Sequence, residues 1–199
     1  MRLIARLGIA ALLCGAAAMT FGGAAAQEKG KVKVGDKAPA FQATDENGRT
    51  WKSSEHVGKK VIVLYFYPAD FTGGCTAQAC GFRDKIGNLK SKDVEVVGVS
   101  GDSAENHKKF KEDFKLPFTL LADEKGEVAK AFGIPANKGG TAKGKTSSGD
   151  IISVTQGVRI SRYTVVIDKN GNVAAIDQIS NAGGDAERVA ALVNKLESK

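Results

Sequence analysis

Cysteine and histidine are scarce in this chain, which has three cysteines and two histidines among its 199 residues. The cysteines are Cys14, Cys75 and Cys80, and the histidines are His56 and His107. A structural zinc site needs about four ligands, usually cysteine or histidine. The C-x-x-C motif of dithiol oxidoreductases is also absent, because four residues separate Cys75 from Cys80. We therefore expect no metal site and no bound cofactor.

Aromatic residues and concentrated positive charge are also in short supply. Phe, Tyr and Trp make up 7% of the chain, and its 29 Lys and Arg side chains are spread along the sequence against 22 Asp and Glu. A nucleic-acid-binding surface would instead concentrate basic residues, often with aromatic ones between them. We infer no nucleic-acid partner from this pattern.

A long apolar run occurs only near the N-terminus, over residues 7–21. Arg2 and Arg6 precede this run, and residues 24–26 are all alanine. This order of basic, apolar and small residues is typical of a secretory signal peptide. A membrane anchor, the alternative, needs about 20 consecutive apolar residues. We predict that residues 1–26 are a signal peptide, so that the protein is periplasmic or otherwise exported and free of the membrane after cleavage.

Removal of this segment leaves Cys75 and Cys80 as the remaining cysteines. The net charge falls from +7 to +5, since Arg2 and Arg6 are lost with the segment. Disulfides persist in exported proteins. A crosslink that closes so short a loop would stabilise the fold little, because the entropic effect grows with loop length. A redox-active pair therefore explains the two cysteines better than a structural disulfide does.

Cys75 follows an apolar run that predicts a buried strand over residues 61–67. Pro68, Thr72 and Cys75 then have P-x-x-x-T-x-x-C spacing. The next residues, 76–89, predict a helix, which places Cys75 near a helix N-terminus. Unpaired backbone N–H groups and the positive end of the helix dipole stabilise a thiolate there. The sequence thus predicts a reactive cysteine.

The spacing of Cys75 and Cys80 also predicts how the two thiols react with each other. In a continuous helix their Cα atoms would lie roughly 8–9 Å apart, on sides about 140° apart. A disulfide requires Cα atoms within about 7 Å. We therefore expect the thiols to join only when the first helical turn unwinds, as in a switch rather than a preformed crosslink.

The remaining sequence predicts an α/β domain over residues 34–199, preceded by a flexible leader at residues 27–33. The two most apolar strands, residues 61–67 and 94–100, flank the 76–89 helix and predict a parallel βαβ unit. Further strands are expected at residues 41–44, 118–122, 163–168 and 173–179, and further helices at residues 104–115, 126–132 and 185–196. Together these elements predict a central mixed β-sheet flanked by helices.

Two segments of this domain carry local predictions. Ser103 is the expected N-cap of the 104–115 helix, in which His107 is expected to be exposed. Residues 136–150 contain almost no apolar residue that could pack, so they predict a mobile loop insertion. Both segments are therefore expected at the surface of the domain.

The cysteine motif described above resembles the peroxiredoxins of the AhpC/TSA type, specifically the bacterioferritin comigratory protein or peroxiredoxin Q subgroup. Residues 98–103 (GVSGDS) and 162–168 (RYTVVID) match the same subgroup. The resemblance covers about residues 31–198, and it implies a thioredoxin-like fold with peroxidase activity. This chain departs from the subgroup at Gly73, where proline is usual, and in the longer insertion at residues 136–150.

The resemblance also implies roles for individual residues. Cys75 matches the peroxidatic cysteine, and Cys80 matches the resolving cysteine. Thr72 matches the threonine whose hydroxyl contacts the thiolate and the peroxide, while Pro68 matches the proline that shields the pocket from water. Arg162 matches the arginine that stabilises the thiolate and the charge developing on the peroxide.

The resemblance therefore implies a thiol-dependent peroxidase that reduces hydrogen peroxide and organic hydroperoxides. Attack of Cys75 would leave a sulfenic acid, which Cys80 converts to an intramolecular disulfide and a thioredoxin-type dithiol protein then reduces. Arg162, with Arg159 as a nearby alternative, would offset the charge on the departing oxygen. The subgroup implies a monomer, or in some members a dimer.

Two other functions stay open from the sequence. A redox-sensing or binding protein would use the same cysteine pair as a switch coupled to a partner surface, for which residues 136–150 are the candidate. A thiol–disulfide exchange enzyme is the other alternative, and the missing C-x-x-C motif argues against it. Steady-state peroxidase turnover with a dithiol donor separates a peroxidase from a sensor.

Overall fold

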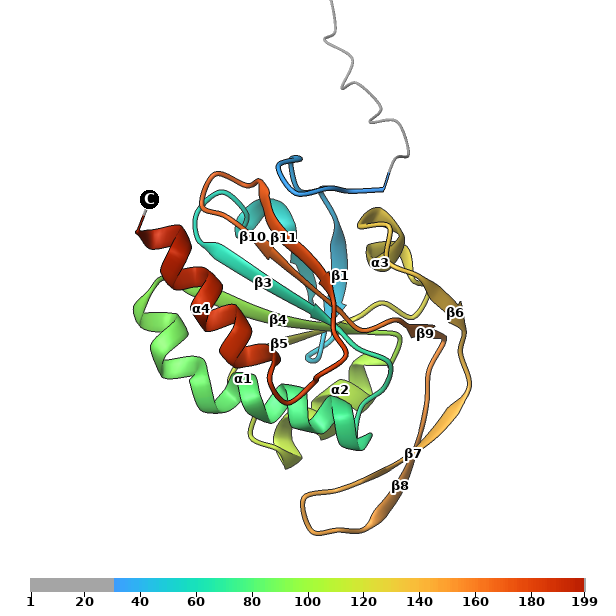
Figure 1. The fold of residues 1–199 in the computed structure, drawn as a ribbon. Coiled ribbons are helices and arrows are strands. Elements are labelled where there is room, and N and C mark those ends of the chain that lie inside the picture. Colours follow the sequence, from blue (N-terminus) through green and yellow to red (C-terminus); the bar gives the residue numbers. More distant parts are fainter. Residues whose placement is uncertain (1–30, 199) are drawn as a thin grey trace, which may run out of the picture.

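The computed structural model describes residues 31–198, which form a seven-stranded sheet with helices on both faces (Figure 1). The strand order is β11-β10-β3-β4-β5-β1-β2. The strands are β1 (Gln42–Asp45), β2 (Thr50–Lys52), β3 (Val61–Phe66), β4 (Val94–Ser100), β5 (Thr119–Ala122), β10 (Tyr163–Ile167) and β11 (Val173–Gln178). Strands β3, β4 and β5 run parallel, and the other pairings are antiparallel. This mixed sheet confirms the expected fold class.

Strand β3 lies in the interior of the sheet, and all six of its residues are buried. Val63 and Tyr65 pack on one face and Leu64 and Phe66 on the other, as side-chain alternation along a strand requires. The strand pairs with β10 on one side and with β4 on the other. The end of β3, where the cysteine motif begins, is therefore fixed from both sides.

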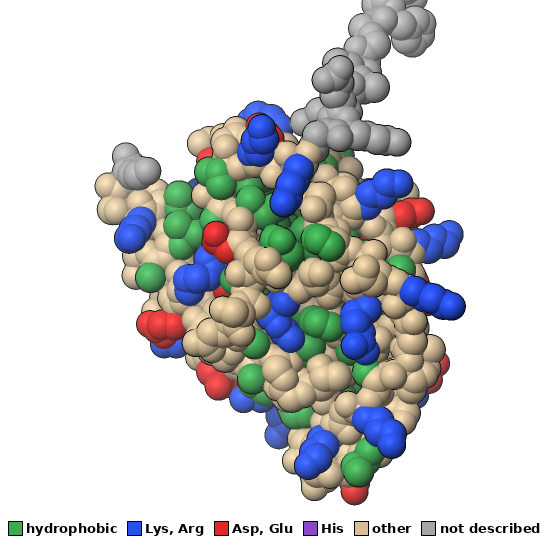
Figure 2. All heavy atoms as spheres, turned by 45° about the vertical axis from the view of Figure 1, so that its right-hand side comes forward, with side chains coloured by type: hydrophobic (Ala, Val, Ile, Leu, Met, Phe, Trp, Pro, Cys, Tyr) green, Lys and Arg blue, Asp and Glu red, His purple; other side chains and the backbone are tan. Residues whose placement is uncertain are grey.

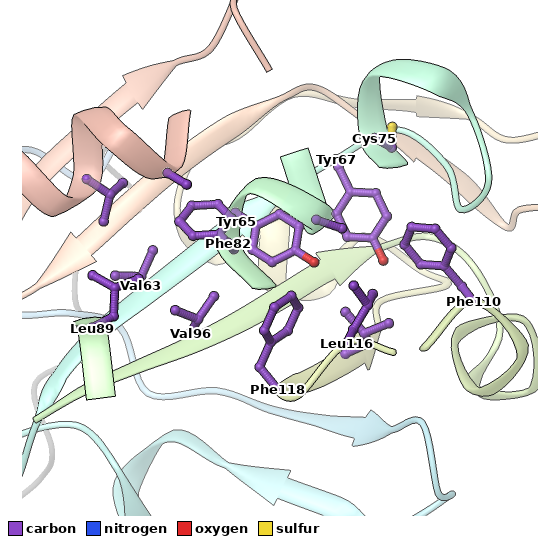
Figure 3. Packing of buried hydrophobic residues seen from close by; sticks show 14 of the residues in the cluster. Val63, Tyr65, Tyr67, Cys75, Phe82, Leu89, Val96, Phe110, Leu116 and Phe118 are labelled. Atoms are coloured by element: carbon purple, nitrogen blue, oxygen red, sulfur yellow. The ribbon is translucent and has the colours of Figure 1, made fainter. Parts of the chain in front are cut away.

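The helices divide between the two faces of the sheet. They are α1 (Gly73–Ser91), α2 (Ala104–Asp113), α3 (Glu127–Ala131), α4 (Asp185–Glu197) and the short 3-10 helix η1 (Ser53–Glu55). Phe82 of α1, Phe110 of α2 and Val189 of α4 pack in one cluster, whereas Val128 of α3 packs in the other. Figure 3 shows the first cluster, in which the ring of Tyr65 stacks on that of Phe82 with centroids 5.0 Å apart.

Residues 136–150 do not form the expected loop. They contain strands of two antiparallel pairs, β6 (Ala136–Lys138) with β9 (Val158–Ile160) and β7 (Thr141–Lys145) with β8 (Ile151–Thr155). Figure 1 shows the β7–β8 hairpin extending past the edge of the sheet. The segment contains few apolar residues because the buried positions of β7 hold small ones, Ala142 and Gly144, which alternate with exposed residues.

Helix α2 begins where expected, but it buries its histidine. Ser103 is the N-cap, and its Oγ accepts a hydrogen bond from the Asn106 amide at 3.2 Å. The expectation that His107 is exposed is wrong, because this side chain is 0% exposed. His107 and the buried Phe110 are three residues apart, so they share the helix face that meets the sheet.

The predicted signal peptide at residues 1–26 lies outside the described residues, as does most of the predicted leader. Within residues 31–198, no helix combines the length and the apolarity needed to cross a membrane. Cleavage after residue 26 therefore stays a prediction.

Candidate active site

Cys75 lies in the first turn of α1, three residues after the N-cap Thr72. Residues 67–72, which we call the active-site turn, connect the end of β3 to this helix. The Thr76 amide donates to the Thr72 carbonyl oxygen at 2.8 Å, which closes the first turn of the helix. Cys75 is 1% exposed. Its thiol therefore lies in the helical turn that carries the free N–H groups and the positive end of the helix dipole.

Arg162 brings a positive charge to the Cys75 thiol. Its Nη2 donates a hydrogen bond to Cys75 Sγ at 3.1 Å. The residue directly precedes β10, and the register of β10 pairs Tyr163 with Phe66, the last residue of β3. The sheet therefore brings Arg162 to the point where the active-site turn begins. Arg159, the alternative from the sequence, lies exposed on β9.

Gln78 and Asp185 hold Arg162 in its orientation. Arg162 Nη1 donates to Gln78 Oε1, and Gln78 Nε2 donates to Asp185 Oδ2 at 2.8 Å. Asp185 also accepts from Thr164 Oγ1 at 2.6 Å and from Arg188 Nη2 at 2.8 Å. Sequence reasoning missed these residues, although Gln78 follows the cysteine by three positions and therefore shares its helix face.

Thr72 and Pro68 lie toward the two ends of the active-site turn. Thr72 Oγ1 donates to the Ala69 carbonyl oxygen at 2.9 Å and makes no capping bond to the helix. The hydroxyl oxygen keeps lone pairs with which it can accept another hydrogen bond. Pro68 is half-buried and directly follows the buried Tyr67. The expected contacts of Thr72 and Pro68 with a peroxide stay predictions.

Cys80 lies on the same unbroken helix as Cys75, and both are free thiols. Burial raises the pKa of the Cys80 thiol, an effect that the charge of Arg83 partly offsets. A thiol with a raised pKa is a weak nucleophile at neutral pH. In the folded helix, Cys80 is therefore a weaker nucleophile than an exposed cysteine, and it forms no disulfide with Cys75.

Beneath the active-site turn lies a buried polar cluster that sequence reasoning missed. Asp70 Oδ1 accepts from the Tyr67 hydroxyl at 2.8 Å, and Asp70 Oδ2 lies 2.8 Å from His107 Nδ1. On its other side, His107 Nε2 lies 3.1 Å from the Leu121 carbonyl oxygen. Burial lowers the pKa of His107, but the Asp70 carboxylate outweighs this effect, so the pKa is raised above its ordinary value. With both ring nitrogens facing acceptors, the imidazole is suited to carry two protons.

A second buried carboxylate, Asp102, fixes the backbone of the turn. Asp102 Oδ2 accepts from the Asp70 amide at 3.0 Å and from Ser100 Oγ at 2.6 Å. Burial and repulsion from Asp70 raise the pKa of Asp102 to about 6. Asp70 thus holds the turn in two ways: its side chain contacts Tyr67 and His107, and its main-chain amide donates to Asp102.

A cavity of ≈ 570 Å³ lies beside the first turn of α1. The active-site turn and α1 form one wall, and the β7–β8 hairpin forms another. The lining residues are Phe71, Gly73, Thr76, Phe114, Lys143, Gly144, Lys145, Thr146 and Ile151. The cavity therefore combines apolar side chains with two lysines on its hairpin side.

Figure 2 shows Lys and Arg side chains spaced over a broad face of the molecule.

Metal-binding side chains are not gathered in the described part of the chain. Within residues 31–198, no group of three or more His, Cys, Asp or Glu residues is placed to hold a metal ion. His56 lies apart from the active-site turn, with Nδ1 3.0 Å from a carboxylate oxygen of Glu95.

Comparison with known proteins identifies relatives of this domain. The model of the AhpC/TSA family matches residues 34–176. Peroxiredoxin Q, chloroplastic, of Oryza sativa subsp. japonica is 46% identical over 147 residues, which cover 74% of this chain and 59% of the rice protein. Peroxiredoxin Q, chloroplastic, of Sedum lineare is 45% identical over 146 residues, which cover 73% of this chain and 69% of that protein.

These relatives contradict the expected localisation. Both are named as chloroplastic proteins, which points away from periplasmic export. Residues 1–26 contain arginine and no acidic side chain, a feature that export signals share with plastid transit peptides. The N-terminal composition therefore did not distinguish the two destinations.

Among solved structures, the crystal structure of peroxidoxin BcpB from Mycobacterium tuberculosis superposes with a TM-score of 0.68 at 28% sequence identity. The match covers 83% of this chain and 98% of that chain. It confirms the expected thioredoxin-like fold, whose sheet and helices bring Arg162 to Cys75. Given the family match over most of the folded domain and relatives above 40% identity, this chain belongs to the AhpC/TSA family of peroxiredoxins, within the peroxiredoxin Q subgroup.

Proposed function

We propose that this protein is a thiol-dependent peroxidase in which Cys75 attacks the peroxide. The observation that carries the proposal is the 3.1 Å hydrogen bond from Arg162 Nη2 to Cys75 Sγ at the start of α1. A guanidinium group and a helix N-terminus both favour the thiolate, which is the nucleophile. Membership of the AhpC/TSA family supports the same reaction.

In the first step, the Cys75 thiolate attacks the terminal oxygen of a hydroperoxide. The S–O bond forms as the O–O bond breaks, which gives a sulfenic acid and an alkoxide or hydroxide that takes up a proton. Arg162 and the helix N–H groups offset the negative charge on the departing oxygen. Thr72 and Pro68 are assigned to the pocket around the reacting peroxide.

In the second step, the Cys80 thiol attacks the Cys75 sulfenic sulfur. A disulfide forms within one chain and water leaves. Because α1 runs unbroken from Gly73 to Ser91, the first helical turn must unwind before the two sulfurs meet. A thioredoxin-type dithiol protein then reduces the disulfide and is itself oxidised. The cycle needs one chain, so we propose that the monomer is active.

The proposed substrates are hydrogen peroxide and organic hydroperoxides. The walls of the ≈ 570 Å³ cavity beside the first turn of α1 include Phe71, Phe114 and Ile151, although Cys75 and Arg162 are not among its lining residues. Apolar walls of this kind suit the carbon chain of an organic peroxide. Hydrogen peroxide needs no such surface.

Cysteine variants test the proposal in a steady-state assay with a dithiol protein donor. Cys75→Ser is expected to abolish peroxide consumption, because the nucleophile is lost. Cys80→Ser is expected to consume about one equivalent of peroxide rapidly and then stop, because the sulfenic acid has no resolving partner. Sustained turnover by Cys75→Ser would contradict the assignment.

A redox switch is the second candidate function, and one contact favours it. The Lys145 amide on the hairpin donates to the Phe71 carbonyl oxygen at 3.0 Å, so unwinding at Cys75 would disturb the hairpin surface. A sensor would respond to peroxide in a near-stoichiometric way with slow recovery. Many turnovers per minute with a dithiol donor would favour the peroxidase.

A further inference from the structure

The buried cluster beneath the active-site turn is not used by the chemistry proposed above. Asp70, Asp102 and His107 are each 0% exposed, and none of them touches the Cys75 sulfur through a described hydrogen bond. Burying charged groups is costly unless each is paired. Such an arrangement at the base of an active site calls for a role in the reaction.

The cluster ties the turn to helix α2 and strand β5 and joins two residues within the turn. Tyr67 lies just after β3, His107 lies on α2, and the Leu121 carbonyl lies on β5. The Asp70 carboxylate accepts a hydrogen bond from the Tyr67 hydroxyl and lies within hydrogen-bond distance of His107. The other ring nitrogen of His107 faces the Leu121 carbonyl of β5. The carboxylate is therefore an anchor point between the active-site turn and the rigid core.

The residue after this anchor has an unfavourable backbone conformation. Phe71 has φ +61°, in the left-handed region that side-chain-bearing residues seldom adopt. Such a conformation is energetically unfavourable and persists only where surrounding contacts impose it. Asp70 holds the turn on the inner side, and the Lys145 amide holds Phe71 on the outer side. The next residue, Thr72, is the N-cap of helix α1.

We propose that Asp70 and His107 are positioning residues for the peroxidase reaction, which hold the active-site turn so that the first turn of α1 stays wound and Cys75 stays beside Arg162. This inference rests on the proposed function. It has two consequences of opposite sign. Loss of the anchor slows sulfenic acid formation, because the thiolate loses its alignment with Arg162. The same loss speeds disulfide formation, because the helical turn that must unwind is held less firmly.

Paired tyrosine variants test this with little disturbance of the fold. Tyr67→Phe removes the hydroxyl that donates to Asp70. Tyr65→Phe is the matched control, because the Tyr65 hydroxyl is equally buried on the same face and has no hydrogen-bond partner within residues 31–198. Rapid quenching and mass spectrometry would follow the sulfenic acid, trapped by a dione reagent, and the disulfide. Tyr67→Phe is expected to slow the first step about threefold and to speed the second, whereas Tyr65→Phe changes neither.

Histidine variants locate the connection more closely. The amide nitrogen of Asn occupies a position near Nδ1 of His, and that of Gln a position near Nε2. His107→Gln is expected to slow sulfenic acid formation about tenfold, whereas His107→Asn, which can still donate to Asp70, retains most of the rate. Circular dichroism would verify that each variant is folded at the assay temperature.

The outcomes separate this inference from the proposed function. Absence of peroxide-dependent sulfenic acid in the wild-type chain would overturn the peroxidase itself. If the wild-type chain forms sulfenic acid and Tyr67→Phe behaves like Tyr65→Phe, only the positioning role is overturned. If both steps slow together in folded Tyr67→Phe, the positioning role is also overturned, because a looser turn must speed the second step.

Discussion

Arg162 and Asp70 hold the reactive cysteine from two sides and in different ways. Arg162 donates directly to the sulfur and is itself oriented by Gln78. Asp70 makes no described contact with the sulfur, but it fixes the turn from which the helix begins. We therefore propose that one side supplies positive charge to the sulfur, whereas the other keeps the helix around it wound.

This difference suggests that reactivity and timing are controlled separately. Substitutions on the Arg162 side should change how fast Cys75 reacts with peroxide and leave the opening of α1 nearly unchanged. Substitutions on the Asp70 side should change both, in opposite directions.

Arg162→Lys is expected to give the largest effect, a loss of about 100-fold in the rate of sulfenic acid formation. Lysine keeps the charge but lacks the planar guanidinium group, whose two Nη atoms donate to Cys75 Sγ and Gln78 Oε1 at the same time. Stopped-flow measurement of peroxide consumption by the reduced protein would detect the loss. Arg159→Lys, at an exposed position of β9, is the control and should match the wild type. A rate for Arg162→Lys within threefold of that control would contradict the direct role of the guanidinium group.

Gly144→Ala extends the comparison to the outer side of the turn. A Cβ at residue 144 would lie 2.5 Å from the Phe71 carbonyl oxygen, so the turn or the hairpin must move. We expect a peroxide step about tenfold slower, because Cys75 is displaced from Arg162. Gly140→Ala is the matched control, since nothing lies within 4 Å of its added Cβ. Equal rates for the two alanine variants would show that the hairpin does not hold the turn.

Gln78→Ala tests how Arg162 is oriented. The guanidinium group stays close to the sulfur but loses one of its partners, so we expect about a fivefold slower peroxide step. Asp185→Asn acts through the same Gln78 amide, and the double variant should therefore be less impaired than the two single effects combined. Fully additive effects would mean that Gln78 and Asp185 act independently.

Asp102→Asn should leave the peroxide step nearly unchanged at pH 8, because asparagine keeps an oxygen for the Asp70 amide. The substitution instead changes the pH dependence of the free energy of unfolding. The pKa of Asp102 is raised to about 6, so the folded state binds this proton more tightly than the unfolded state. Its contribution to stability therefore falls as the pH rises from about 4 to about 6. Urea unfolding across this pH range should show that the free energy of unfolding of Asp102→Asn lacks this decrease. The pKa of His107 is also raised, so its stabilising contribution is lost at higher pH, in both proteins. An unchanged pH dependence between pH 4 and 6 would contradict the burial of a titrating Asp102.

The sequence predicted the parts of the fold that depend on large apolar side chains. Strand β3 is apolar throughout and β4 is mostly so, and the observed bounds of β4 are those expected. The Cys75 position at the start of a helix followed from the same pattern. The β7–β8 hairpin was missed because its inward positions are Ala142 and Gly144, which are too small to register as a packed face.

The polar part of the site was predicted only in part. Arg162 was found through family resemblance, since nothing in its neighbourhood distinguishes it from Arg159 until the sheet register places it. His107 was missed because the lysines around it predicted a solvated helix. The signal that could have revealed its burial is the spacing of His107, Phe110 and Phe114 along one helix face. Contacts such as Asp70 with His107 join residues far apart in sequence, and only the fold brings them together.

The central claim is that Cys75 and Cys80 join only after the first turn of α1 unwinds. Hydrogen exchange of the peptide spanning residues 73–79, compared between the reduced protein and the peroxide-oxidised protein, tests it most directly. We predict that the Thr76 amide, bonded to the Thr72 carbonyl at 2.8 Å in the folded helix, is protected when reduced and exchanges freely when oxidised. Equal protection in both states, with the Cys75–Cys80 disulfide present, would contradict the account.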